Sequence, residues 1–386
     1  MKKLIAPRTL PSLQMHGLLA KTPSQPSPYA WVATTPWAII VLLLLIGGFG
    51  IAALYSAAHG NWYPWAVPHA LRFCLGFCFM AGVALIPISF IRRYAFLWWL
   101  LAVAVLLLLE LIGTGRGSQR WFSIGGFNFQ PSEPTKLAVI CLLAAYFHHL
   151  SPDRITRVTT YIPVLAIILL PFTLVLLQPD LGTSMMLLLA GAAVVFVAGI
   201  PRWMIGVVLG LAAAALPLAW SLLYPYQRER IQVFLNPEMD ALGAGYQITQ
   251  SKIALGSGGV FGKGYLQGSQ SHLDFIPERQ TDFIFTVIGE EFGMLGCLYV
   301  IALYTVLILL LLRHAQAMKS VFARLVANGV AAMLVLFVSV NIAMVSGMLP
   351  VVGAPLPLIS YGGTAMMTVF LGIGMVMSAA RTDDVE

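Results

Sequence analysis

Long apolar runs recur along the whole chain and are separated mostly by short polar connections. Each run approaches the roughly 20 residues that a helix needs to cross about 30 Å of hydrocarbon. The alternating segments of about ten residues that membrane barrel strands require are not visible in the sequence. The pattern therefore predicts ten transmembrane helices, at residues 36–57, 68–90, 94–112, 133–150, 158–177, 181–199, 201–224, 283–312, 323–347 and 356–379.

Two connections are longer than neighbouring helices in a bundle require. Residues 113–132 and residues 225–282 contain many aromatic residues and few charges, which is not the composition of a disordered segment. Within the second connection, residues 243–259 begin as a short amphipathic helix and continue into a glycine-rich stretch. This stretch either brings the backbone close to a ligand or serves as a flexible connection.

The composition agrees with a membrane protein. Of the 386 residues, 59% are hydrophobic and 10% are charged, and the mean hydropathy is +0.86. A soluble globule could not hide so many apolar side chains from water. We therefore expect an all-α polytopic membrane protein, with one helical domain at residues 36–380 between tails at residues 1–35 and 381–386.

Lysine and arginine residues predict the orientation in the membrane. They lie before the first span, in the connections from even to odd spans and at the C-terminus, so both termini are expected in the cytoplasm and both long connections outside. The net charge of +7 then reflects topology and gives no reason to expect a nucleic acid partner. The residues are Lys2, Lys3, Arg8, Lys21, Arg92, Arg93, Arg154, Arg157, Arg202, Arg313, Lys319, Arg324 and Arg381.

Ionisable residues cost about 2.5–3.5 kcal/mol each inside a membrane span, so each one needs a reason. Here they gather near the starts of the even-numbered spans and in the outer connections, which all lie on the outer side. We expect them to converge on one cavity there. The set comprises Arg72, Arg120, Trp121, Glu133, Lys136, Asp180 and Asp282, with Ser360 and Tyr361 from the ninth connection.

Simpler interpretations stay open for individual residues. Asp180 and Glu133 would also compensate the dipoles of the helices that they begin. Trp121 also fits the belt of aromatic residues at a membrane interface. Glu290 and Glu291 lie too far into their span to act as caps, so we expect them to support the structure.

A cavity with both signs of charge fits a polyanionic substrate that is attached to a lipid, such as a lipid pyrophosphate. Arginine and lysine stabilise the charge on a phosphate leaving group, and one carboxylate would take a proton from an attacking sugar hydroxyl. Asp282 is the candidate base because it lies where the long connection enters a span. Burial would raise the pKa of its carboxyl, and nearby cations would lower it. Glu133 and Lys136, three residues apart, either pair or line the cavity together.

Five segments, in this order, resemble the SEDS family of shape, elongation, division and sporulation proteins, and within it the rod-shape-determining branch. They are GSQRWFSIGGFNFQPSEPTKLA, QPDLGTS, GAGYQITQSKIALGSGG, LDFIPERQTDFIFTVIGEEFG and MLPVVGAPLPLISYGG. One segment alone would be weak, but five in the expected order are specific. The resemblance extends from the first predicted span to the last.

The resemblance implies a peptidoglycan glycosyltransferase that polymerises lipid II at the outer face of the bacterial inner membrane during cell elongation and rod-shape maintenance. Its implied partners are a class B penicillin-binding protein transpeptidase and other membrane proteins of the elongation complex. A flippase that transports lipid II is the alternative, although transporters usually place charges near the middle of the bilayer. A scaffold that only recruits the transpeptidase would leave the buried charges unexplained.

The resemblance also implies roles for single residues. Asp282 is the implied catalytic residue, and Asn128 departs from the basic residue that several relatives have there. The basic residues, with or without a divalent cation such as Mg²⁺, would stabilise the undecaprenyl pyrophosphate that leaves. The expected substrate-binding residues are Arg72, Arg120, Trp121, Glu133, Lys136, Asp180, Lys252 and Ser360.

Overall fold

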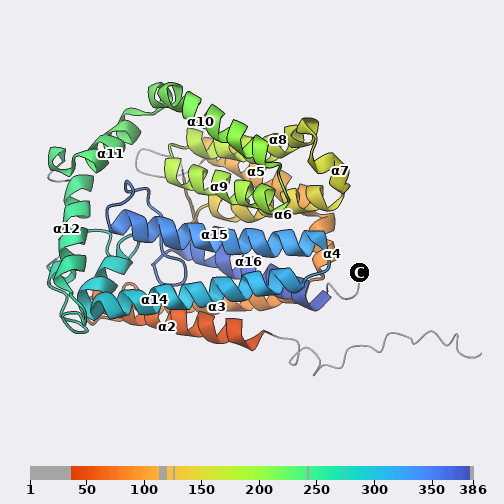
Figure 1. Ribbon diagram of the computed structural model, residues 1–386. Helices are drawn as coiled ribbons and strands as arrows, with labels where there is room; N and C mark the ends of the chain where they lie inside the picture. The colour runs from red at the N-terminus through yellow and green to blue at the C-terminus, as the bar shows by residue number, and fades with distance from the viewer. Residues whose placement is uncertain (1–35, 113–119, 125–126, 241–242, 274, 383–386) are drawn as a thin grey trace, which may run out of the picture. The chain divides into compact units, whose positions relative to one another are not determined.

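The computed structural model describes residues 36–112, 120–124, 127–240, 243–273 and 275–382 of the chain. Residues 1–35, which were expected to form a cytoplasmic tail, lie outside the described part. The described chain is almost entirely helical (Figure 1). Its long helices are α2 (Trp37–Ala57), α3 (Ala66–Leu85), α5 (Ala95–Ile112), α6 (Ser132–His148), α8 (Tyr161–Leu177), α9 (Leu181–Val197), α10 (Arg202–Leu222), α14 (Ile284–Ala317), α15 (Val321–Val345) and α16 (Gly363–Thr382).

Shorter elements lie in the connections between these helices. They are α4 (Ile88–Arg93), α7 (Pro152–Ile155), α11 (Pro225–Leu235), α12 (Ala244–Ser257), α13 (Ser269–His272), the 3-10 helices η1 (Val158–Thr160) and η2 (Pro237–Met239), and the strands β1 (Phe122–Ile124) and β2 (Phe127–Phe129). The amphipathic helix expected at residues 243–259 is confirmed as α12.

Six helices in the described part are long and apolar enough to cross a membrane, namely α2, α3, η1 with α8, α14, α15 and α16. Three further stretches are apolar but shorter, at Ala95–Glu110, Leu181–Val197 and Arg202–Leu218. The 17 residues of α6 form another helix of similar length. The predicted all-α membrane fold is confirmed, whereas the number of ten spans stays a prediction.

Proline shortens the second predicted span. The run expected to be helical at residues 68–90 ends as α3 at Leu85, and α4 begins only after Pro87. A proline pushes the residue before it out of the helical region, and Ile86 is accordingly extended, with φ −75° and ψ 130°. The chain therefore turns here, at the C-terminal end of α3.

The last predicted span starts later than expected for a similar reason. The run at residues 356–379 was expected to be helical with a broken start. The non-helical part extends through residue 362, so it is longer than expected. The segment that contains Pro355 and Pro357 is not helical, and α16 begins only at Gly363. This non-helical segment before α16 forms part of the candidate site.

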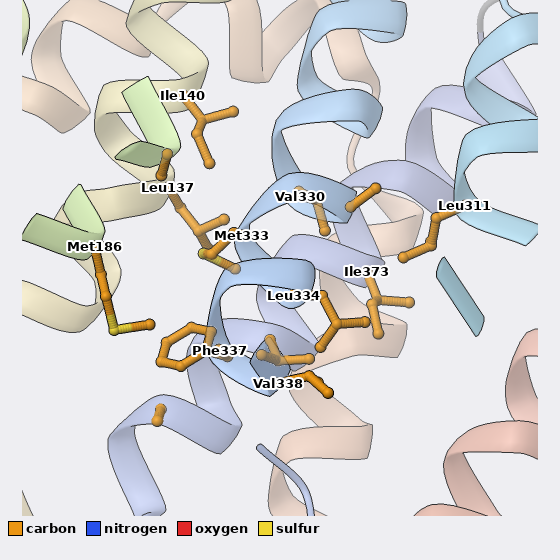
Figure 2. Close-up of a cluster of buried hydrophobic side chains, with 14 of the residues drawn as sticks. Leu137, Ile140, Met186, Leu311, Val330, Met333, Leu334, Phe337, Val338 and Ile373 are labelled. Atoms are coloured by element: carbon orange, nitrogen blue, oxygen red, sulfur yellow. The ribbon is translucent and has the colours of Figure 1, made fainter. Parts of the chain in front are cut away.

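The core of the bundle is built around α15. This helix packs against α6, α9, α14 and α16. Its Gly329 lies so close to α6 that a Cβ atom there would be 2.5 Å from the side chain of Ile140, so a small residue allows the two backbones to approach. Figure 2 shows the apolar side chains that meet here, Leu137, Ile140, Met186, Leu311, Val330, Met333, Leu334, Phe337, Val338 and Ile373.

The first long connection contains a β-hairpin that we did not predict. Strands β1 and β2 pair antiparallel, with Phe122 opposite Phe129 and Ile124 opposite Phe127. The alternation of apolar residues on both sides of two glycines is a hairpin signal, but strands of three residues are too short to stand out from a loop.

A break in α14 organises the second long connection. Gly293 has φ 65° and ψ −159°, which no helix contains, so the 34 residues of α14 are two helical pieces joined at this glycine. Breaking a helix leaves backbone carbonyl and N–H groups without their usual partners. In a membrane protein such groups must find other partners within the protein.

The glycine-rich loop that follows α12, residues 258–268, supplies those partners. The N–H groups of Lys263 and Gly264 donate to the carbonyls of Glu290 and Glu291, at 3.0 Å each. On the far side of the break, the N–H groups of Met294 and Leu295 donate to loop carbonyls at 2.9 and 3.1 Å. The loop is therefore bonded to both pieces of α14.

The carboxylate of Glu290 binds the same loop and the helix α13 that follows it. It is fully buried and accepts hydrogen bonds from Lys263 Nζ at 2.7 Å, Gln270 N at 2.8 Å and Ser271 N at 3.2 Å. Its neighbour Glu291 accepts from the hydroxyl of Ser56 in α2 at 2.5 Å. The expectation that both glutamates support the structure now has a physical account, since they anchor the loop and tie α2 to α14.

We predict that Gly262→Ala lowers the melting temperature of the purified protein. Gly262 has φ +82°, and a Cβ atom there would lie 2.0 Å from the carbonyl oxygen of Glu291. The left-handed conformation alone costs an alanine about 1–2 kcal/mol, and the backbone contact adds to it. The matched control is Gly256→Ala, where no atom lies within 4 Å of the added Cβ. Equal melting temperatures for the two variants in detergent would contradict the anchoring of the loop.

Candidate functional site

Polar residues from five helix starts lie at one end of the bundle. Hydrogen bonds and close contacts connect the segments that carry these polar residues, so residues far apart in sequence become neighbours. Their roles in substrate binding or catalysis stay predictions. The segments are the starts of α3, α6 and α9, the turn before α14, and the loop between α15 and α16.

Asp282 lies in the turn that leads into α14, and its backbone is held in place. The side-chain amide of Asn341 donates to the carbonyl of Asp282 at 2.9 Å and to the carbonyl of Ala354 at 2.7 Å. Its half-buried carboxylate faces Gly353, where a Cβ atom would be 3.6 Å from Oδ2. One buried amide from α15 thus joins the turn before α14 to the loop before α16.

The surroundings of Asp282 raise the pKa of its carboxyl to about 7. Burial is the main cause, because it disfavours the charged form, and the negative charge of Glu278 adds to it. Arg230 acts in the opposite direction and lowers this pKa, while Asp180 raises it. A carboxyl with a pKa near neutrality can take up and release a proton under physiological conditions, as a general base must.

Asp180 is both a helix cap and part of the site. Its carboxylate accepts from the backbone N–H of Thr183 at 3.2 Å and from the hydroxyl of the same residue at 2.9 Å, which caps α9. The side-chain amide of Gln130 donates to it at 3.1 Å. The capping role that stayed open in the sequence is confirmed, and it places the carboxylate at the edge of a pocket.

This pocket is small, with a volume of about 30 Å³, and it is lined by two cations and one carboxylate. That volume is about one tenth of the roughly 300 Å³ at which ligand sites begin, so the cavity has room for a water-sized group and not for a lipid-linked sugar. The lining residues include Arg120, Asp180, Gln227, Arg230 and Val351. Residues from the first long connection, from α9, from α11 and from the loop before α16 therefore share one cavity.

The guanidinium of Arg120 donates hydrogen bonds to two backbone carbonyls and so stabilises the fold. Its Nε donates to the carbonyl of Gln178 at 3.0 Å, and its Nη2 donates to the carbonyl of Pro179. These carbonyls follow the end of α8, where a cation is favoured by the helix dipole. Arg120 thus joins the first long connection to the turn between α8 and α9 and lies at the pocket wall.

Arg230 is a site residue that our sequence analysis missed. It lies on α11, and its Nη1 donates to the carbonyl of Val351 at 2.9 Å. The signal available in the sequence was the run Arg228, Glu229 and Arg230, three consecutive charged residues in that connection. Without the fold, nothing in that run says which of the two arginines faces the pocket.

Glu133 and Lys136 form a buried ion pair at the start of α6. Lys136 Nζ lies 2.7 Å from Glu133 Oε1, and the two side chains are 0% and 5% exposed. The ammonium also lies 4.3 Å from the centre of the Phe337 ring on α15, a cation–π contact. The pairing that the spacing permitted is confirmed.

Arg72 contacts the loop before α16, to which Ser360 belongs and which lies beside Asp282. The guanidinium of Arg72 stacks 4.4 Å from the ring centre of Tyr361, and the N–H of Tyr361 donates to the carbonyl of Gln280 at 2.8 Å. The buried hydroxyl of Ser360 accepts from the N–H of Leu356 at 2.7 Å, so it shapes the loop before α16. Arg72 therefore connects to the turn that carries Asp282 through Tyr361, whereas Arg230 acts on the Asp282 carboxyl itself.

Two expected binding residues lie further out. Trp121 is 36% exposed and is the residue just before β1. Lys252 is exposed on α12, where its side chain lies against Gly347 at the end of α15. Asn128 pairs with Ser123 in the hairpin, whose hydroxyl donates to its side-chain oxygen at 2.7 Å. The contacts described above do not join Trp121 or Lys252 to Asp282.

Among the described residues, no three His, Cys, Asp or Glu side chains lie close enough together to hold a metal ion. A divalent cation such as Mg²⁺ therefore stays a prediction. The arrangement offers one near-neutral carboxyl at Asp282 with the guanidinium of Arg230 close enough to lower its pKa, which suits proton removal next to an anionic leaving group.

Comparison with known proteins gives a consistent result. The sequence profile of the family described as "Cell cycle protein", which covers FtsW, RodA and SpoVE, matches residues 31–384. The chain is similar to the peptidoglycan glycosyltransferase MrdB of Escherichia coli K12, with 43% identity over 310 residues that cover 80% of this chain and 83% of that protein.

Solved structures extend the similarity to three dimensions. A chain from a peptidoglycan synthase complex that coordinates polymerization and crosslinking has a TM-score of 0.78 and 30% identity, and the match covers 91% of this chain and 99% of that one. The rod shape determining protein RodA of Thermus thermophilus has a TM-score of 0.69 and 27% identity, covering 90% and 97% of the two chains.

We predict that Lys136→Met destabilises the protein strongly, because it leaves the carboxylate of Glu133 buried without its partner. Breaking a buried ion pair in this way costs about 3–5 kcal/mol, whereas replacing both partners is often nearly neutral. The double variant Glu133→Gln with Lys136→Met should therefore recover most of the melting temperature in a thermal unfolding experiment. A double variant as unstable as Lys136→Met would contradict this account.

Proposed function

Because the chain belongs to the cell-cycle protein family of FtsW, RodA and SpoVE, we propose that it is a peptidoglycan glycosyltransferase that polymerises lipid II into glycan strands. It is a multi-pass inner-membrane protein. The observation that carries the proposal is Asp282, a carboxyl with a pKa of about 7 at one end of the bundle, on which the guanidinium of Arg230 acts. The polymerisation would take place at the outer face of the membrane, during cell elongation and rod-shape maintenance.

The reaction joins two lipid-linked glycans. Asp282 removes the proton from the 4-hydroxyl of the acceptor sugar, and this oxygen attacks the anomeric carbon of the donor. The bond between that carbon and the pyrophosphate oxygen breaks, and undecaprenyl pyrophosphate leaves with the bonding electrons. The proton is held on Asp282, whose pKa near neutrality allows its later release to water.

The cations next to Asp282 would stabilise the charge that develops on the leaving pyrophosphate. Arg230 and Arg120 line the pocket beside Asp180, and Arg72 stacks on Tyr361, whose N–H is bonded to the turn that carries Asp282. Guanidinium groups bind phosphate oxygens in pairs of hydrogen bonds, which gives both strength and direction. A divalent cation such as Mg²⁺ would add to this charge stabilisation when bound. Glu133, Lys136 and Ser360 would keep these segments in place, while Trp121 and Lys252 would contact outer parts of the substrate.

The proposed partner is a class B penicillin-binding protein that cross-links the strands. The support is the similarity to a chain of a peptidoglycan synthase complex in which polymerization and crosslinking are coordinated. Other membrane proteins of the elongation complex are proposed as partners on the resemblance alone. A flippase for lipid II has no support from the relatives, which are named as glycosyltransferases.

Replacing the proposed base should abolish polymerisation. Asp282→Asn keeps the shape of the side chain but cannot accept the proton, so we expect the rate to fall by at least about 100-fold, the usual contribution of a general base. The assay is the polymerisation of purified lipid II in detergent with the class B partner present, with strands resolved by length.

The matched control is Glu238→Gln, an exposed carboxylate in η2 of the same outer connection, which should keep full activity. Strands made at the wild-type rate by Asp282→Asn would overturn the base assignment. Scrambling of labelled lipid II across liposomes without polymer formation would instead support the flippase.

The dependence of the rate on pH should identify the base more directly. The rate should rise with pH through an apparent pKa near 7, because only the ionised carboxylate of Asp282 accepts a proton. Glu278 raises this pKa, so Glu278→Gln should move the rise to lower pH. Arg230 lowers it, so Arg230→Gln should move the rise to higher pH.

These opposite shifts are measured as the pH of half-maximal kcat/KM between about pH 5.5 and 9. They separate an effect on Asp282 from a general loss of activity, since a misfolded variant loses rate at every pH. Shifts in the same direction, or none in either variant, would show that another group controls the rate.

A further inference from the structure

The tip of the glycine-rich loop exposes apolar side chains. Phe261 is 80% exposed, Val260 is 47% exposed, and Tyr265 and Leu266 are 40% and 36% exposed. Exposed apolar residues that stand together are costly in water and mark a surface that meets a partner or a membrane. None of these side chains takes part in the proposed reaction.

The exposure of this tip is built into the fold. The carbonyls of Gly259 and Val260 accept hydrogen bonds from Met294 and Leu295, so the backbone beside Phe261 is fixed to α14. On the other face of the loop, Lys263 turns inward to the buried carboxylate of Glu290 at 2.7 Å. The loop therefore has one apolar outer face and one polar inner face, as an interfacial membrane segment does.

The length of α14 gives the depth of this tip. The piece that follows Gly293 contains about 24 residues, and at 1.5 Å per residue it is about 36 Å long. A hydrocarbon core is about 30 Å thick, so this piece alone crosses it and its first turn reaches the outer boundary. Met294 and Leu295, which bind the loop, lie in that first turn.

The tip is also continuous with the surface that α14 and α2 present to lipid. Met294, Leu298 and Tyr299 of α14 are 52%, 51% and 43% exposed. The Tyr265 hydroxyl donates to the carbonyl of Ala52 in α2 at 2.9 Å. Figure 1 shows α12 ending beside the start of α14 and the adjoining end of α2.

Aromatic rings fill the space between the loop and the two helices. The rings of Phe49 and Phe292 are 5.2 Å apart, and those of Tyr265 and Phe292 are 5.7 Å apart. Phe49 also contacts Tyr299 at 5.4 Å. Aromatic residues at this level are typical of the interface between membrane and water.

We infer that residues 259–266 form a wedge that enters the outer leaflet beside α2 and α14, with Val260 and Phe261 among the upper parts of the lipid chains. The ligand is therefore the lipid surface itself. The inference depends on the membrane placement of the chain and not on the proposed reaction, so either can fail without the other.

The test uses a fluorescent label whose emission reports contact with lipid. Phe261→Cys is made in a full-length chain whose four cysteines are replaced, labelled with an NBD dye and placed in liposomes of phosphatidylglycerol and phosphatidylethanolamine. Leu298→Cys, on the exposed face of α14, is the control for lipid contact. Leu235→Cys, 74% exposed at the end of α11, is the control for contact with water.

We expect lipids with a nitroxide near the headgroup to quench the label at Phe261 at least about threefold more than the label at Leu235, and to a degree similar to Leu298. Quenching equal to that at Leu235 would overturn the wedge. Weak quenching in liposomes with strong shielding after addition of the class B partner would also overturn it, in favour of a protein contact. Retained lipid II polymerisation by each labelled variant confirms that it is folded.

Discussion

The break of α14 at Gly293 is the constraint on which the outer half of the molecule depends. It frees backbone groups that a membrane protein must satisfy internally, and the loop at residues 258–268 meets that need with four backbone hydrogen bonds. The buried carboxylates of Glu290 and Glu291 hold the same loop and reach across to α2. A charge inside an apolar helix is thus explained by a defect in that helix.

The site depends on a second interruption of helical structure. Pro355 and Pro357 keep the segment before α16 out of the helical conformation. Because α16 begins only at Gly363, the loop before it stays free to lie beside Asp282. Asn341 then bonds to the backbone of both segments. Arg120 and Arg230 line a pocket beside this loop, and Arg72 stacks on Tyr361 within the loop.

Sequence reasoning reached the helical fold and the proximity of Asp180 to Asp282, because counting membrane crossings places alternate helix starts on one side. It could not reach Arg230, since the position of α11 is set by tertiary contacts and no periodic pattern records them. It found the glycine-rich stretch but not its role, which requires knowing that Gly293 breaks the helix. It proposed Arg120 for substrate binding, but it did not predict that the side chain also donates hydrogen bonds to two carbonyls after the end of α8.

The piece of α14 that precedes Gly293 acts as a spacer of fixed length. On the membrane placement inferred above, its roughly nine residues lift the turn that carries Asp282 by up to about 13 Å from the outer boundary of the hydrocarbon. A pyrophosphate on a prenyl chain sits among the headgroups, so the sugar beyond it stands at about the height of that carboxylate. Under the proposed function, the protein would select substrates whose lipid anchor holds the sugar at the height of Asp282. A soluble sugar nucleotide has no such anchor and would not be held at that height.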